Sequence, residues 1–256
     1  MKFLSKLLII ALLIVSSAFK ADAQYSGSYD VGTGMMPTLF AAFYFISNAG
    51  LSGDVTLNIM NNINENSNQL PVLSQWTVGS NYTITIKPST NAPAEGWTVQ
   101  GNFNDGLIVL NGCSNVIIDG GPDKKLTFKN NNSSTTSAVF RLKSLGAGLG
   151  CENITIKNCK IYGGSASTLG CYGVYAFDNS AITNTPTPSP TSGADNNNLT
   201  ITNNLFYKVR HGILVMGSTT TSLTGLEISN NTFGSITPSE FIGVKSIWVE
   251  NVDAPT

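Results

Sequence analysis

Short segments in which aliphatic and polar residues alternate recur along most of the chain. Four of them are closed by Asn or Gly, at residues 115–120, 153–158, 198–203 and 225–230. A second set of alternating pairs lies between them: Leu107/Val109, Phe140/Leu142, Val174/Ala176, Ile213/Val215 and Ile247/Val249. The first members of these pairs are 33, 34, 39 and 34 residues apart. Alternation at two residues predicts strands, and a period near 34 predicts a solenoid whose turns stack on one another.

The many asparagines fit the same architecture. The chain contains 28 Asn residues, many of them at the ends of the predicted strands. Asn and Gly tolerate the left-handed backbone conformation that a tight corner needs, and stacked Asn side chains hydrogen-bond along a fibre-like axis. We therefore attribute the Asn excess to the corners of a solenoid and not to a catalytic site.

One segment near the N-terminus has a different pattern. Residues 37–50 are apolar on most sides, with Pro early and Gly at the end, which predicts a buried helix. Its expected place is over the open first coil, because the ends of solenoids otherwise expose core and strand edges. Residues 55–59 and 82–86 are predicted strands of the early coils, with an Asn-rich loop at 61–69 between them.

The first 23 residues have the layout of a secretory signal peptide. Lys2 and Lys6 precede an apolar run at 7–15, and Ala21-Asp22-Ala23 fits a cleavage site. We expect residues 1–23 to be the signal peptide, 24–53 the cap with its helix, and 54–256 the coils. No later segment predicts a membrane span, so we expect a secreted or cell-surface protein. Residues 247–251 begin another coil near the end of the sequence, so we also expect coils that continue in a longer protein.

The predicted cap and coils resemble a known superfamily. Residues 53–57 and 83–88 resemble the start of right-handed parallel β-helix proteins of the pectin-lyase-like superfamily. Residues 110–120, 144–159 and 193–198 resemble secreted Bacteroidetes-type members, which often carry a C-terminal sorting domain for type IX secretion. The resemblance covers nearly the whole mature chain and implies an all-β, right-handed parallel β-helix with an N-terminal capping helix. It implies no single function, because the superfamily contains lyases, hydrolases, esterases and non-catalytic adhesins.

Composition and charge limit the classes of partner that the chain could bind. Charged residues make up 11% of the chain, with 14 Lys and Arg against 15 Asp and Glu. A nucleic-acid partner would need a basic excess, which is absent. No Cys or His spacing resembles a zinc site, and we predict neither a metal nor a cofactor. We expect a monomer.

The second strand family is the place to look for catalysis. If Leu107 and Val109 point inward, the outward residues are Ile108/Leu110, Arg141/Lys143, Tyr175/Phe177, Leu214/Met216 and Trp248/Glu250. Glycoside hydrolysis needs two carboxylates facing the bond, and Glu250 is the one acid on this face, so we predict no catalytic residue. His211-Gly212 is similar to a pair found in polygalacturonases, but their other motifs are missing. We interpret His211 as a solvated or corner residue and Asp178 as a turn residue.

The outward residues on this face are better suited to binding a sugar than to catalysis. Tyr175 and Trp248 suit stacking on sugar rings, and Arg141 suits acidic groups. We expect a polysaccharide or cell-surface glycan as partner. The alternative is that the Thr- and Pro-rich insertion at 181–198 covers this surface. The competing function is a polysaccharide lyase or glycoside hydrolase whose site lies in loops or in coils beyond residue 256.

Two of the four cysteines occupy equivalent positions. Cys113 and Cys151 each precede the first aliphatic residue of a strand by three positions, so they should lie above one another on adjacent coils. That spacing suits a disulfide, and we predict either a disulfide or a stacked thiol pair. Cys159 occupies the corner position filled by Asn204 and Asn231 in later coils, and no pairing with Cys171 is assigned.

Overall fold

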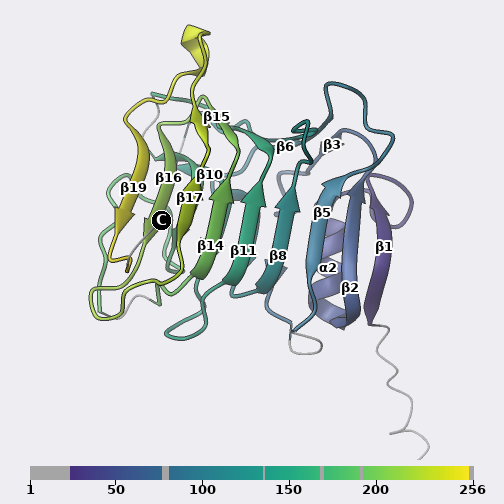
Figure 1. Cartoon of the computed structure of the whole chain (residues 1–256), viewed down its shortest axis with the longest axis horizontal. Helices are drawn as coiled ribbons and strands as arrows, with labels where there is room; N and C mark the ends of the chain where they lie inside the picture. The colour runs from purple at the N-terminus through teal and green to yellow at the C-terminus, as the bar shows by residue number, and fades with distance from the viewer. Residues whose placement is uncertain (1–23, 77–80, 135, 168–169, 191–192, 254–256) are drawn as a thin grey trace, which may run out of the picture.

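The chain winds into a stack of coils, and each coil contributes one strand to each of three parallel sheets (Figure 1). The structure, a computed structural model, describes residues 24–76, 81–134, 136–167, 170–190 and 193–253. The predicted signal peptide lies outside the described residues. We call the sheets A, B and C in the order in which the chain visits them.

Sheet A has seven strands: β1 (Tyr25–Val31), β2 (Leu51–Ile59), β5 (Ile84–Pro88), β8 (Ser114–Asp119), β11 (Glu152–Lys157), β14 (Asn197–Thr202) and β17 (Glu227–Ser229). Sheet B has six: β3 (Ile63–Asn64), β6 (Trp97–Gly101), β9 (Leu126–Asn130), β12 (Cys159–Tyr162), β15 (Leu205–Tyr207) and β18 (Thr232–Phe233). Sheet C also has six: β4 (Val72–Ser74), β7 (Gly106–Asn111), β10 (Ser137–Lys143), β13 (Cys171–Phe177), β16 (His211–Met216) and β19 (Lys245–Glu250). A 3₁₀ turn, η1 (Pro238–Glu240), lies between β18 and β19.

The all-β parallel helix predicted from the repeats is confirmed, with one sheet more than the two strand families indicated. The sheet that the sequence did not predict is sheet B, whose strands have between two and five residues. Such short strands carry almost no alternation. Their single inward residues, such as Ile161, Phe206 and Phe233, repeat from coil to coil and are the signal that identifies the third sheet.

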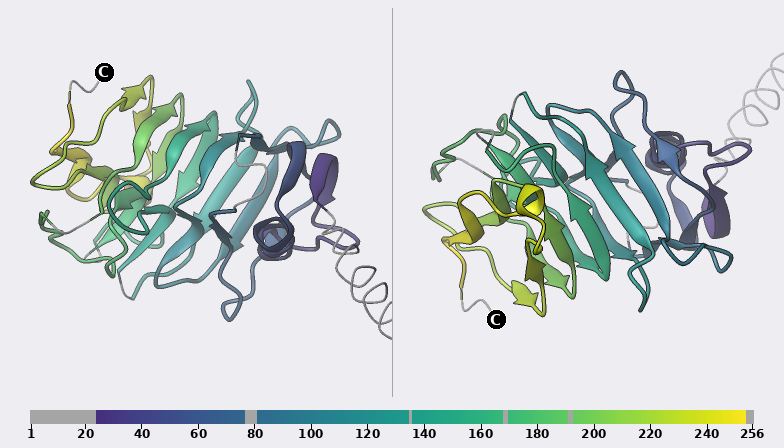
Figure 2. Two further views of the ribbon diagram at one scale, coloured as in Figure 1. Left: turned by 90° about the horizontal axis from the view of Figure 1, so that it is seen from below. Right: turned by 90° about the horizontal axis from the view of Figure 1, so that it is seen from above.

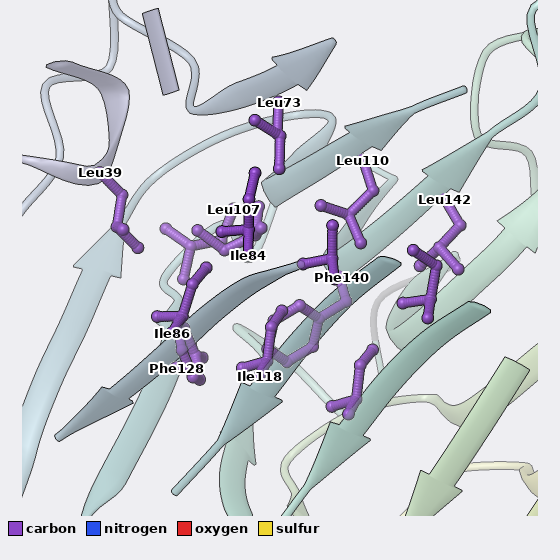
Figure 3. Close-up of a cluster of buried hydrophobic side chains, with 14 of the residues drawn as sticks. Leu39, Leu73, Ile84, Ile86, Leu107, Leu110, Ile118, Phe128, Phe140 and Leu142 are labelled. Atoms are coloured by element: carbon purple, nitrogen blue, oxygen red, sulfur yellow. The ribbon is translucent and has the colours of Figure 1, made fainter. Parts of the chain in front are cut away.

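The core runs along the axis between the three sheets and consists mainly of stacked aliphatic and aromatic side chains. Ile86 and Ile118 enter from sheet A, Phe128 from sheet B, and Phe140 from sheet C, and all are fully buried (Figure 3). Phe128 and Phe140 meet edge to face, with ring centroids 4.9 Å apart. Each coil therefore covers the apolar residues of the one before it, as the solenoid interpretation requires.

The predicted register of β7 is wrong by one residue. Ile108 and Leu110 pair with Phe140 and Leu142 and face the core, whereas Val109 pairs with Arg141 on the outside. In β7 the four residues 107–110 are all aliphatic and all buried, so the sequence carries no alternation from which to choose a face. The inward pairs predicted for β10, β13, β16 and β19 are aligned with one another as expected.

The asparagine corners have the backbone that was predicted. Between sheets A and B, Asn158 and Asn203 have φ of 57° and 54°, and at the start of the sheet A strands Asn115, Asn153 and Asn198 also have positive φ. Their side chains form ladders. Asn153 Nδ2 donates to Asn115 Oδ1 at 3.0 Å, and Asn203 Nδ2 donates to Asn158 Oδ1 at 2.7 Å. The corner asparagines thus serve both the turn and the bonding between coils.

The predicted helix, α2 (Leu39–Ala49), lies at the N-terminal end of the stack (Figure 2). Thr38 caps it, its Oγ1 accepting a hydrogen bond from Ala41 N at 3.2 Å, and Gly50 follows it with a positive φ. Leu39, Phe43 and Ile46 are buried against the first coils. A second cap comes from Glu65, whose carboxylate accepts hydrogen bonds from Leu39 N at 2.7 Å and Phe40 N at 3.4 Å.

Candidate functional site

The outer face of sheet C is covered. Tyr172, Tyr175, Phe177, Leu214 and Met216 form a second apolar cluster outside the main core. Ile182 and Ala194, from the Thr- and Pro-rich insertion, complete the cluster and pack over it. The Tyr172 hydroxyl donates a hydrogen bond to Thr183 O at 2.8 Å. The insertion therefore covers this face over β13 and β16, which is the alternative to ligand binding that the sequence left open.

Arg141 is held under the same insertion. Its guanidinium lies 2.7 Å from Asp105 Oδ1, donates to the Ser180 carbonyl and sits 5.6 Å from the centre of the Tyr175 ring. Lys143 reaches the other Asp105 oxygen at 3.7 Å. Burial and the neighbouring Arg141 charge lower the pKa of Lys143. Arg141 and Tyr175 are 2% and 0% exposed, so a ligand would reach them only if the insertion lifted away, and their binding role stays a prediction.

His211 is not solvated, contrary to the interpretation from sequence. It begins β16, is 4% exposed and stacks on Tyr172 with the ring centres 5.0 Å apart. Burial, with the charges of Arg210 and Lys245, lowers its pKa from 6.5 to about 4, so the ring is neutral at pH 7. The position of His211 at the start of a predicted strand does not show whether it lies in the corner or in the strand. Nothing in the sequence indicates that the Tyr172 ring covers it. Asp178 is a turn residue as predicted, since its Oδ1 accepts from Ser180 N at 2.9 Å.

Trp248 is the one predicted ligand-binding aromatic that remains partly exposed. Its indole Nε1 donates to Glu250 Oε1 at 2.6 Å, and Lys245 Nζ lies 3.4 Å from the centre of its ring. A cation over the ring occupies the face that a sugar would use. The structure therefore places the predicted binding residues in one outward row of sheet C, with Arg141 and Tyr175 under the insertion and Trp248 partly exposed on β19.

The predicted cysteine pair lies at equivalent positions on adjacent coils. Glu152 N donates to Cys113 O, and the strands that follow the two cysteines are in register. Both side chains are buried, Cys151 Sγ donates to Leu110 O at 3.3 Å and to Lys143 O at 3.5 Å, and burial raises the pKa of the Cys113 thiol. All four cysteines are thiols in the structure, so the disulfide stays a prediction. Cys159 occupies the asparagine position as predicted, because Cys159 N donates to Asn204 Oδ1 and Asn204 N donates to Asn231 Oδ1.

The outer face of sheet B holds an open groove of about 560 Å³. It is lined by amides, hydroxyls, two lysines and a tyrosine: Asn62, Asn64, Thr98, Gln100, Thr127, Lys129, Lys160 and Tyr162. Cross-strand pairing aligns them in two rows, one passing through Thr98, Thr127 and Lys160 and the other through Gln100, Lys129 and Tyr162. A polar groove of this volume is in the range of about 300–1,000 Å³ that ligand sites occupy.

Tyr162 marks the end of this groove nearer the C-terminus. Its ring stacks on Tyr207 of the next coil, with centroids 4.6 Å apart and planes at 30°. Its hydroxyl donates to Glu240 Oε1 at 3.4 Å, and burial together with the Glu240 charge raises its pKa to about 12. The tyrosine hydroxyl is therefore protonated at neutral pH, when it serves as a hydrogen-bond donor.

Sequence reasoning missed this groove because sheet B itself was missed. Its outward residues are polar side chains in strands too short to recognise singly. The signal is the repeat of a polar residue on each side of one apolar residue, as in Thr127-Phe128-Lys129 and Lys160-Ile161-Tyr162.

Sheet A carries a smaller groove, of about 360 Å³, lined by threonines, asparagines and Ile117. The asparagine side chains there bond to one another along the axis, as Asn198 Nδ2 does to Asn153 Oδ1 at 3.1 Å. Within the described residues, no group of three or more His, Cys, Asp or Glu side chains is arranged to hold a metal ion. No helix in the described part of the chain is long and apolar enough to cross a membrane.

Comparison with known proteins gives one result that agrees with this geometry. A family model described as a right-handed beta helix region matches residues 82–251. Neither curated proteins nor solved structures yield a match to the chain. The matched segment includes β5 to β19 and thus most of all three sheets. Parallel strands stacked in three sheets, asparagine corners and the family match agree, and the chain belongs to the right-handed β-helix family.

Proposed function

We propose that this chain is an exported, non-catalytic β-helix scaffold that binds carbohydrate outside the cell or at its surface. The observation that carries the proposal is the contrast between two faces of one solenoid. Sheet C is covered over β13 and β16 by its insertion, whereas sheet B presents an open polar groove. Rows of amides and hydroxyls beside an aromatic ring are suited to sugar hydroxyls and ring faces. The layout of residues 1–23 supports export.

The competing function is a polysaccharide lyase or hydrolase. One observation favours it: Arg141, Lys143, His211 and two tyrosines gather on sheet C, and several of them have shifted pKa values. Clustered shifted groups are typical of active sites. Against it, Asp105 is paired with Arg141 and Lys143, and Asp178, whose charge also acts on Tyr175, is bonded to Ser180 in a turn. The ion pairs of Asp105 and the insertion that covers Arg141 are better explained by a structural role for this face of sheet C.

One experiment separates the two functions. The mature chain is incubated with a panel of neutral and acidic polysaccharides, with and without calcium, and retained protein and released products are both measured. The proposal expects retention of the protein on at least one polysaccharide with no new reducing ends and no unsaturated sugars. Product formation that Arg141→Gln abolishes would establish the enzyme instead. No retention on any member of the panel would overturn carbohydrate binding.

A further inference from the structure

The two charged side chains that line the sheet B groove have the same sign, and the Glu240 carboxylate contacts the Tyr162 hydroxyl at the end of the groove. Lys129 and Lys160 are the ionisable cations in its lining, and no carboxylate occupies either outward row between β3 and β15. The Lys129 ammonium makes no hydrogen bond or ion pair within the described part of the chain, and the Lys160 ammonium has one contact, a 3.5 Å hydrogen bond to the Glu95 carbonyl. Both ammonium groups are thus available, and their positive potentials add in the groove.

The groove repeats from coil to coil along the solenoid axis. From Asn64 to Tyr207 its second row crosses five strands, and at about 4.8 Å a strand this amounts to about 19 Å. Along that row Gln100 Nε2 donates to Asn64 Oδ1 at 2.6 Å, which fixes the orientation of the amides. An extended polymer lying parallel to the solenoid axis would meet polar groups at each coil and the tyrosine pair at one end.

From this arrangement we infer that the sheet B groove binds an acidic polysaccharide, with Lys129 and Lys160 pairing with its anionic groups and Tyr162 contacting a sugar ring. This inference rests on the proposed carbohydrate-binding function. Charge complementarity selects the acidic polymer over a neutral one. The sheet A groove has no charged lining residue and its asparagines are bonded to one another, so it lacks this selectivity.

The test measures binding of the mature chain to two acidic polymers and their uncharged counterparts. Polygalacturonate carries carboxylates and is compared with its methyl ester, and dextran sulfate carries sulfates and is compared with dextran. The variant is Lys129→Gln with Lys160→Gln. The matched control, Lys87→Gln with Lys157→Gln, removes the same charge from the outer face of sheet A. A thermal unfolding profile confirms that each variant is folded. Lysine acetylation with and without polymer, read by mass spectrometry, maps the site directly.

We expect tighter binding of at least one acidic polymer than of its uncharged counterpart, and weaker binding at high salt because exposed charges are screened. The groove variant should lose about tenfold in affinity and the control less than twofold, with Lys129 and Lys160 protected from acetylation. The acidic polymer that binds identifies the anion. Equal effects of the two variants, or protection of other lysines, would overturn this site but leave carbohydrate binding standing. Binding of neutral polymers alone would do the same. No binding to any polysaccharide would overturn both proposals.

Discussion

Glu65 is a buried carboxylate whose ionisation should oppose folding, and this predicts a stability effect that one substitution removes. Its side chain is 6% exposed and lies against the N-terminus of α2. Burial raises its pKa from 4.5 to about 7, and the two backbone hydrogen bonds from Leu39 and Phe40 only partly offset this. A tenfold change in proton affinity corresponds to about 1.4 kcal/mol. The rise in the pKa of Glu65 therefore corresponds to about 3 kcal/mol in the free energy of unfolding.

The sign follows from which state holds the proton more tightly. The folded chain binds this proton more tightly than the unfolded chain, so the contribution is fully present below pH 4.5 and is lost as the pH rises through about 7. Glu65→Gln keeps the shape of the protonated carboxyl and has no charge to lose. We therefore expect the variant to match the wild type near pH 4.5 and to be more stable by about 3 kcal/mol at pH 8.

The measurement is the difference in free energy of unfolding between Glu65→Gln and the wild type, from guanidinium titrations followed by tryptophan fluorescence at several pH values. The difference is needed because His211 changes stability in the opposite direction over part of the same range. Its lowered pKa makes its contribution present above pH 6.5 and lost as the pH falls through about 4. Glu152→Gln, which replaces an exposed glutamate of sheet A, is the matched control for the loss of a carboxylate. A difference for Glu65→Gln that does not grow with pH would refute the reasoning.

Three further predictions concern other parts of the fold. His211→Gln should lessen the loss of stability between pH 6.5 and about 4, measured by the same titrations; equal losses in variant and wild type would contradict the pKa assigned to the buried ring. Asn158→Ala should destabilise the chain by about 2 kcal/mol, since Asn158 has φ 57° and bonds to Asp119 and Asn203. Asn158→Gly should cost less because glycine accepts that backbone, and equal costs would exclude backbone strain. Mass spectrometry of the mature protein, alkylated after unfolding without reductant, should find Cys113 and Cys151 joined; alkylation of both would leave them a thiol pair.

The sequence predicts the architecture better than it predicts the surfaces. Successive coils repeat the same features, namely aligned pairs such as Phe140/Leu142 and Val174/Ala176 and asparagines at fixed corners. Because each coil gives the same signal, a chance pattern in one coil does not change the predicted architecture. In β7 the alternation disappears because residues on both faces are buried, and there the register was wrong. The alternation of apolar and polar residues shows which side of a strand faces the core only when the other side is more polar.

The candidate sites were harder to predict because they depend on what covers each face. Arg141 and Tyr175 are outward residues, as predicted, yet the insertion covers them, and the guanidinium has two partners outside the insertion, Asp105 before β7 and Ser180 after β13. Glu65 lies in a segment interpreted as an Asn-rich loop, and its contact with α2 joins residues 26 positions apart. The sheet B groove needs two coils in register before Lys129 of β9 and the pair Lys160 and Tyr162 of β12 form one surface. None of these relationships is local in the sequence.

The most direct test of the account is a crystal structure of the mature chain with an oligosaccharide of the acidic polymer that binds it. The account predicts an intact, uncleaved chain of sugars along sheet B between Asn64 and Tyr207, with anionic groups at Lys129 and Lys160 and the insertion still closed over sheet C. An oligosaccharide seated on sheet C beside Arg141 with the insertion displaced, or cleaved products in either place, would contradict it.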